Sequence, residues 1–114
     1  MLKGYDSRTA VNKKDASMKD LSALTAVTGD EFAMFTKGQE RLIIRGDKEH
    51  VSVNETMASE LNAQGYKWSG HTHPGIEKGF TLPSDGDVLI LKQFKQETSV
   101  IYNSKGQYST FGKY

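Results

Sequence analysis

The sequence predicts one mixed α/β domain in which helices flank a mixed β-sheet. Segments whose apolar residues recur every three or four positions alternate with short segments rich in β-branched and aromatic residues. The 114 residues are 36% hydrophobic and 25% charged, which is the ordinary composition of a globular domain. Because a chain of this length can bury about 60% of its unfolded surface, it can fold without a disulfide or a structural metal.

The N-terminal half predicts an arm, a helix and a strand pair. Residues 1–16 are polar and lack apolar periodicity, so we expect a flexible linker or arm followed by a domain over residues 17–114. The domain opens with a short amphipathic helix that Gly29 ends. Its apolar residues recur every three positions: Met18, Leu21, Leu24 and Val27. Two strands joined by a turn are expected at residues 31–36 and 41–45, and residues 50–53 are a candidate third strand.

The C-terminal half predicts two further helices and three strands. Asn54 is a helix N-cap before an apolar pattern that ends before Gly65, and a strand is expected over residues 66–73. A helix should run from Ser84 to about Gln96. A closing hairpin is expected from residues 98–102 and 107–111.

The composition excludes several classes of function. Lysine and arginine total 15 and aspartate and glutamate 14, and without a basic stripe we expect no nucleic-acid partner. Cysteine is absent, which excludes thiol catalysis, disulfides and every cysteine-based zinc site. The longest apolar runs, such as residues 88–91, are far shorter than the roughly 20 residues of a membrane span, so we expect no membrane partner.

Two histidines carry the first chemical signal. His71 and His73 lie two residues apart on a predicted strand, so their imidazole rings project from the same face of the sheet. Pro74 and Gly75 end that strand, which places both rings at an edge where they can share one metal ion. His50 has no partner at ligand spacing, and we interpret it as structural or exposed.

A carboxylate completes a candidate metal site. Asp87 follows His73 by fourteen residues and falls in the first turn of the helix that Ser84 begins. Three protein ligands leave the fourth tetrahedral position of zinc for water, as in catalytic zinc sites, and zinc lowers the pKa of that water toward about 7. Ser84 and Asp87 also fit a helix-capping pattern, and Asp85 is an alternative ligand.

Two short motifs resemble the H-x-H-P…S-x-x-D signature of the JAMM (JAB/MPN-plus) metalloproteases, a family of zinc isopeptidases that includes deubiquitinases. The motifs are Gly70-His71-Thr72-His73-Pro74 and Pro83-Ser84-Asp85-Gly86-Asp87. The resemblance implies a JAB/MPN-like fold, layered as in cytidine deaminases, over residues 17–114. It implies zinc bound by His71, His73 and Asp87, an oxyanion stabilised by Ser84, and an upstream glutamate that acts as general acid and base.

Glu31 is our candidate for that glutamate, because it lies forty residues before His71 at the head of a predicted strand. Glu40, in the turn region before the next strand, is the alternative. Glu55 and Glu60 lie on the predicted second helix, where we expect them to face solvent.

The resemblance implies hydrolysis of peptide or isopeptide bonds in a protein or peptide, with a ubiquitin-like protein as one candidate substrate. The small size and the polar arm are similar to bacterial JAB-type domains of polymorphic toxins and phage-tail proteins. On that analogy we expect the toxic C-terminal domain of a larger secreted protein, delivered to the cytoplasm of a target cell and inhibited by an immunity protein. The alternatives are a catalytically silent MPN-type scaffold that binds a protein, and a metal-dependent nuclease, which the near-neutral charge disfavours.

Overall fold

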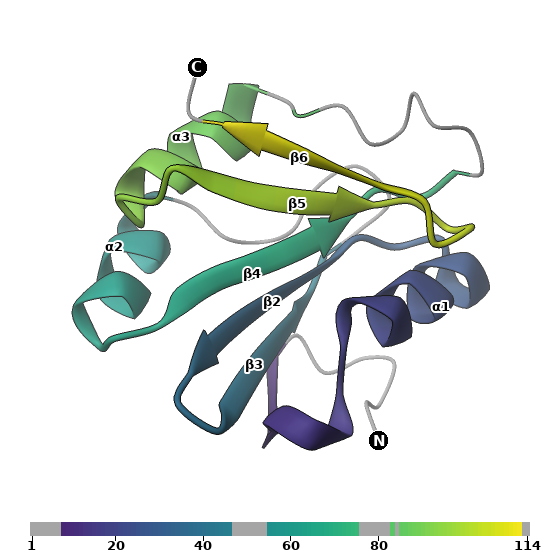
Figure 1. Ribbon diagram of the computed structural model, residues 1–114, viewed down its shortest axis with the longest axis horizontal. Coiled ribbons are helices and arrows are strands. Elements are labelled where there is room, and N and C mark those ends of the chain that lie inside the picture. Colours follow the sequence, from purple (N-terminus) through teal and green to yellow (C-terminus); the bar gives the residue numbers. More distant parts are fainter. Residues whose placement is uncertain (1–7, 47–54, 76–82, 84, 113–114) are drawn as a thin grey trace.

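The computed structural model describes residues 8–46, 55–75, 83 and 85–112 (Figure 1). The strands are β1 (Arg8–Asn12), β2 (Phe32–Lys37), β3 (Glu40–Arg45), β4 (Lys67–Thr72), β5 (Thr98–Tyr102) and β6 (Tyr108–Gly112). The helices are α1 (Met18–Thr28), α2 (Glu55–Ala63) and α3 (Asp85–Gln93), and a 3-10 turn spans Lys13–Asp15. In these parts of the chain no helix has the length and apolar character needed to cross a membrane.

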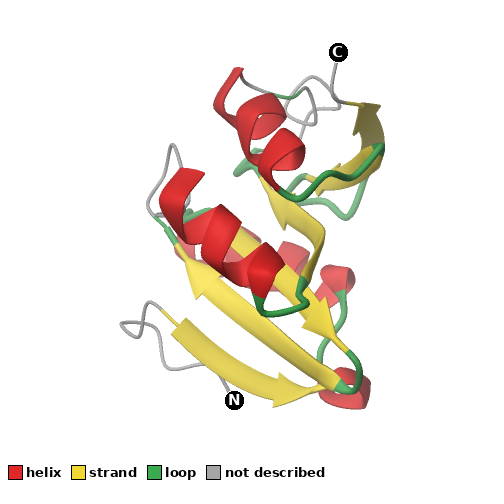
Figure 2. Ribbon diagram, turned by 90° about the vertical axis from the view of Figure 1, so that its left-hand side faces the viewer, coloured by secondary structure: helices red, strands yellow, loops and turns green. Residues whose placement is uncertain are grey.

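The six strands form one mixed sheet between two helical layers. The strand order is β1-β3-β2-β4-β5-β6, and β4 and β5 are the parallel pair, joined through α3. Helix α1 covers one face of the sheet, whereas α2 and α3 cover the other and lie nearer the viewer in Figure 2. This arrangement confirms the expected mixed α/β class with a mixed sheet and flanking helices.

The core is divided between the two faces of the sheet. On the α1 face, Leu21 packs against Phe32, Met34 and Ile43. On the other face, α2 and α3 pack against a larger cluster of aromatic and aliphatic side chains. Its members include Phe35, Leu61, Trp68, Leu91, Phe94, Ile101 and Phe111.

Helix α1 begins and ends where its local sequence predicts. The Ser17 hydroxyl accepts the Asp20 N–H, and the Asp20 carboxylate accepts the Ser17 N–H at 2.7 Å, which forms a capping box. Gly29 ends the helix at φ 78°, a left-handed conformation that glycine adopts without strain. Val27, expected in the apolar stripe, is instead 84% exposed. At about 100° per residue, nine residues turn Val27 to the side opposite Met18.

Residues 8–15, expected to belong to a flexible arm, form β1 and the 3-10 turn at one edge of the sheet. Strand β1 pairs antiparallel with β3, with Ala10 opposite Leu42. Val11 packs against the cluster beneath α1. In this strand Ala10 is exposed and Val11 is partly buried, so no apolar periodicity is visible in the sequence. The candidate strand at residues 50–53 lies outside the described residues.

Strands β2 and β4 pair through a bulge that shifts the register by one residue. Ala33 is opposite His71 and Met34 opposite Gly70, but Phe35 is opposite Trp68. Ser69 is therefore the extra residue in β4. Because side chains alternate along a strand, an inserted residue brings Trp68 and His71 to the same face of the sheet.

The bulge is stabilised by contacts that residues 94–99 provide. Helix α3 ends at Gln93, earlier than expected, and Gln96 lies beyond it. The Gln96 side chain accepts the Trp68 N–H at 2.6 Å and donates to the Trp68 carbonyl at 3.0 Å. The amide of Gln96 therefore satisfies both backbone groups of Trp68 beside the extra residue.

Gly70 is required by close packing across the sheet. A Cβ atom there would lie 2.7 Å from Val100 Cγ2, 3.0 Å from the Val100 carbonyl oxygen and 3.2 Å from Met18 Cε. The backbone oxygen cannot move without disturbing β5. Only glycine fits between the β4 backbone and these neighbours.

We predict that Gly70→Ala lowers the free energy of unfolding by about 1–3 kcal/mol, the usual cost of overpacking a core. Urea denaturation measures this change. Gly112→Ala is the matched control, because its added Cβ would meet the Glu97 carbonyl oxygen at an ordinary 3.5 Å. Equal stability of the two variants would contradict the steric account.

Candidate metal centre

His71 and His73 lie at the C-terminal end of β4, and Asp87 lies in the first turn of α3. Strand β4 is followed along the chain by α3 and then by the parallel strand β5, so α3 belongs to the crossover between the two strands. Such crossovers bring the carboxyl end of a strand close to the start of the following helix. The fold thus brings two imidazoles close to a carboxylate that lies fourteen residues after His73 and sixteen after His71.

The polar atoms of this group lie at nearly equal separations. His71 Nε2 is 3.1 Å from Asp87 Oδ1, and His73 Nε2 is 3.2 Å from Asp87 Oδ2. The two Nε2 atoms are 3.1 Å apart. Together these three side chains form a group that could hold a metal ion.

These separations suit a tetrahedral metal ion. Two ligand atoms with bonds of about 2.1 Å to zinc lie about 3.4 Å apart at the tetrahedral angle. The two histidines are close to different oxygens of Asp87, and one ligand atom from each of the three side chains lies within 4.8 Å of the others. A side-chain adjustment would therefore bring one Asp87 oxygen to this spacing from both histidines. Nitrogen and oxygen donors of this kind bind zinc, and they also accept iron, manganese or cobalt.

Glu31 lies beside the three candidate ligands, immediately before β2. Its Oε2 is 4.0 Å from His73 Nε2, and its side chain is 8% exposed. The His73 and Asp87 side chains are about twice as exposed, at 16% and 15%. The group is therefore reachable from solvent at His73 and Asp87, while Glu31 is held in a more protected position. Ionised Glu31 and Asp87 would together carry the charge that a divalent cation balances.

His71 is oriented by aromatic packing. It is 1% exposed, and its ring stacks on Trp68 with centroids 4.9 Å apart and an interplanar angle of 19°. Phe111 meets the His71 ring edge-on at 5.9 Å. Across the part of the chain that the structure describes, His71 Nδ1 has no hydrogen-bond partner. The orientation of the His71 ring is therefore fixed by its aromatic neighbours and by the contact of Nε2 with Asp87.

The segment after β4 is tied to the turn between β5 and β6. The His73 N–H donates to the Tyr102 carbonyl at 2.9 Å. The Gly75 N–H donates to Ser104 Oγ at 3.0 Å, and the Ser104 N–H donates back to the Gly75 carbonyl at 2.7 Å. These bonds fix the backbone of His73 although it lies beyond the strand.

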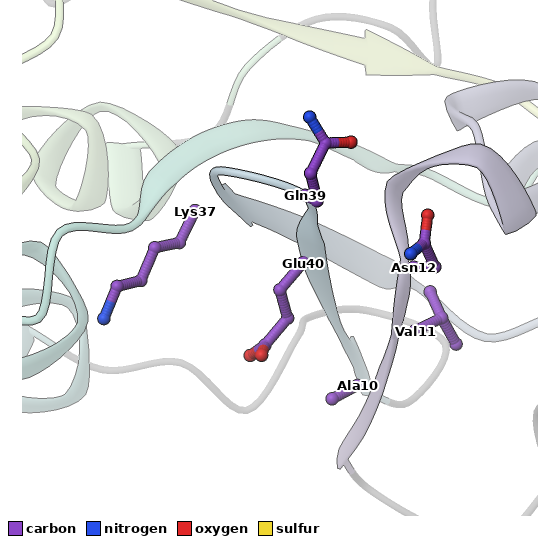
Figure 3. Close-up of a pocket in the computed structure, with 6 residues that line it drawn as sticks. All are labelled: Ala10, Val11, Asn12, Lys37, Gln39 and Glu40. Carbon is purple, nitrogen blue, oxygen red and sulfur yellow. The ribbon is translucent and has the colours of Figure 1, made fainter.

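Glu40, the alternative general base, lies at the other end of the β2–β3 hairpin. Lys37 pairs with Glu40 next to the turn, five residues from Phe32, which is about 17 Å along a strand. The Glu40 carboxylate accepts a hydrogen bond from the Tyr66 hydroxyl. It also borders a surface hollow of about 510 Å³ between β1 and the hairpin (Figure 3). The geometry therefore favours Glu31 over Glu40 as the partner of the histidines.

Other candidates from the sequence lie outside the described residues. These are Ser84, His50 and the side chains of Asp85 and Glu55. Glu60, on α2, is exposed as expected. Sequence reasoning did not identify the stacking of Trp68 on His71, because it depends on the bulge at Ser69.

Burial lowers the pKa of His71 below its ordinary value of 6.5, because the desolvated imidazole resists protonation. The hydrogen bond and the charge of Asp87 oppose this shift, and the charge of His73 adds to it. A neutral imidazole keeps a lone pair on one of its two ring nitrogens. Metal binding through Nε2 requires the tautomer in which the proton is on Nδ1.

We predict that the metal-free protein loses stability as the pH falls below about 6.5. In that range the unfolded chain protonates His71 whereas the folded protein resists it, so the free energy of unfolding falls by up to about 1.4 kcal/mol per pH unit from this group. Urea denaturation at pH 7.5 and 5.5 measures the loss. His71→Phe, which keeps an aromatic ring against Trp68, should lose less; an equal loss in both proteins would show that another group is responsible.

In comparisons with protein-family models, curated proteins and solved structures, this chain matches none of them. The case for its function therefore depends on its own residues: the two short motifs and the side chains that the fold brings together around His71 and His73.

Proposed function

We propose that this protein is a zinc-dependent hydrolase of peptide or isopeptide bonds, of the JAMM type. The observation that carries the proposal is the convergence of His71, His73 and Asp87 on one point, with the Glu31 carboxylate beside them. Three ligands and a nearby acid–base residue are what a catalytic zinc site needs, whereas a structural site would have a fourth protein ligand.

The arrangement of the elements also supports the proposal. The histidine strand lies near the middle of a mixed sheet, α1 covers one face, and the helix that carries Asp87 covers the other. We infer a JAB/MPN-like fold from this order together with the H-x-H-P and S-x-x-D motifs.

Each residue has a distinct role in the proposed reaction. His71, His73 and Asp87 would hold the metal, which when bound supplies a Lewis acid and lowers the pKa of water. Glu31 would accept a proton from the attacking water and deliver it to the leaving nitrogen. By the resemblance, Ser84 would donate a hydrogen bond to the developing oxyanion.

The toxin context is a separate part of the proposal. If the domain hydrolyses proteins in a target cell, its expression in the cytoplasm should inhibit growth only while His71 and His73 are intact. Co-expression of an immunity protein would relieve that inhibition. Growth inhibition by a His71→Ala/His73→Ala variant would argue against this context without bearing on the metal centre.

We predict that Glu31→Gln retains about one zinc per chain but lowers kcat by about 10²–10⁴-fold, because glutamine cannot accept the proton. Zinc content is measured by elemental analysis. Hydrolysis is measured with a fluorescence-quenched peptide library and with lysine-linked diubiquitin. Glu40→Gln is the matched control and should keep full activity, because Glu40 lies at the far end of the hairpin.

The ligand assignment is tested in the same preparations with Asp87→Asn, which preserves the shape of the side chain. This variant should lose both zinc and activity. Full activity of Glu31→Gln would refute its role as the base. A wild-type protein that takes up no zinc, even when zinc is added, would favour the silent protein-binding scaffold.

A further inference from the structure

Thr72 lies between the two histidines and faces the opposite side of the sheet. Its side chain is completely buried against α1, where its hydroxyl is hydrogen-bonded to the hydroxyl of Thr25. The same hydroxyl oxygen accepts the backbone N–H of Phe32 at 2.9 Å. Thr72 therefore connects three elements: α1, the start of β2 and the end of β4.

The contact with Phe32 extends the pairing of β2 and β4 beyond their backbone ladder. That ladder runs as far as Ala33 opposite His71. One residue further, the Phe32 N–H is bound by a side chain. Strand β2 is thus held against the histidine strand up to the residue that follows Glu31.

The backbone around Glu31 is hydrogen-bonded on both sides. On the side of β3, the Glu31 carbonyl accepts the Gly46 N–H at 2.8 Å. On the side of β4, the N–H of the adjoining residue Phe32 is bound to the Thr72 hydroxyl. Because the carboxylate must lie within reach of a water molecule beside His73, the backbone of this segment has to be fixed against β4.

We propose that Thr72 is a positioning residue of the metal centre: its hydroxyl fixes Phe32 and so holds the Glu31 carboxylate against His73. This inference rests on the proposed function, in which Glu31 is the base. Thr25 supports the arrangement because it gives the buried Thr72 hydroxyl a second polar partner, which such a group requires. Strand β4 and the residue after it would thereby carry the histidine ligands on one face. On the other face they would carry Thr72, which holds Glu31 in position.

The first test uses the metal-free protein and needs no activity. In Thr72→Val, which keeps the shape but loses the oxygen, amide exchange at Phe32 measured by NMR should accelerate at least about fivefold, from the loss of one hydrogen bond. Thr72→Ser should keep the slow exchange. If Thr72→Val does not fold, Thr72→Ser and Thr72→Ala form a second pair that differs by the same oxygen. Equal exchange rates within a folded pair would overturn the proposal.

The second test asks whether Thr72 acts through Glu31. Thr72→Val should lower kcat by about 10–100-fold, the cost of misplacing a catalytic group by about 1 Å, while zinc affinity stays within about twofold of wild type. Thr72→Ser should restore most of the lost kcat. Thr110→Val, on the exposed side of β6, controls for the substitution itself.

A double-mutant cycle separates positioning from a general structural effect. In a Glu31→Gln background, Thr72→Val should cause little further loss of kcat, because the base is already removed. An undiminished loss in that background would overturn the proposal. If the wild-type protein binds zinc but hydrolyses neither probe, the proposed function fails, and the amide exchange alone decides whether Thr72 holds Phe32.

Discussion

The bulge at Ser69 is the constraint on which the candidate metal centre depends. One extra residue in β4 puts Trp68 and His71 on the same face of the sheet, so that the indole supports the imidazole. Beyond the bulge, regular alternation resumes and points His73 the same way, while Thr72 faces α1. The Gln96 side chain satisfies the backbone at Trp68, so the distortion leaves no peptide group of that residue without a partner.

Both faces of β4 therefore contribute to the candidate metal centre. On one face, an apolar layer excludes water from His71, which keeps the imidazole neutral and able to bind a metal. On the other face, buried hydroxyls connect β4 to α1 and to β2. The exposed part of the centre, at His73 and Asp87, is where a substrate would approach. In the proposed site, one buried ligand, one protected carboxylate and two accessible ligands would form an open rather than a closed metal site.

Part of this structure could be predicted from local signals in the sequence. Ser17 and Gly29 mark the ends of α1, and the two-residue spacing of the histidines predicts a shared face. Features that depend on distant pairing could not be derived from the sequence. The proximity of Glu31 to His73 requires β2 and β4 to be neighbours, which only the family resemblance suggested. The one local signal for the bulge is Gly70, because a glycine inside a strand suggests a bulge or a close approach of two backbones. It does not identify Ser69 as the extra residue, since serine fits a regular strand equally well. The edge strand β1 buries too little to show a pattern.

The most direct test of the account is anomalous diffraction at the zinc absorption edge from crystals grown with zinc. The account predicts one peak per chain, bonded at about 2.0–2.2 Å to Nε2 of His71, Nε2 of His73 and a carboxylate oxygen of Asp87. Glu31 should lie outside bonding distance and leave the fourth position to solvent. A peak at another place, no peak, or a fourth protein ligand that closes the site would contradict a catalytic metal centre.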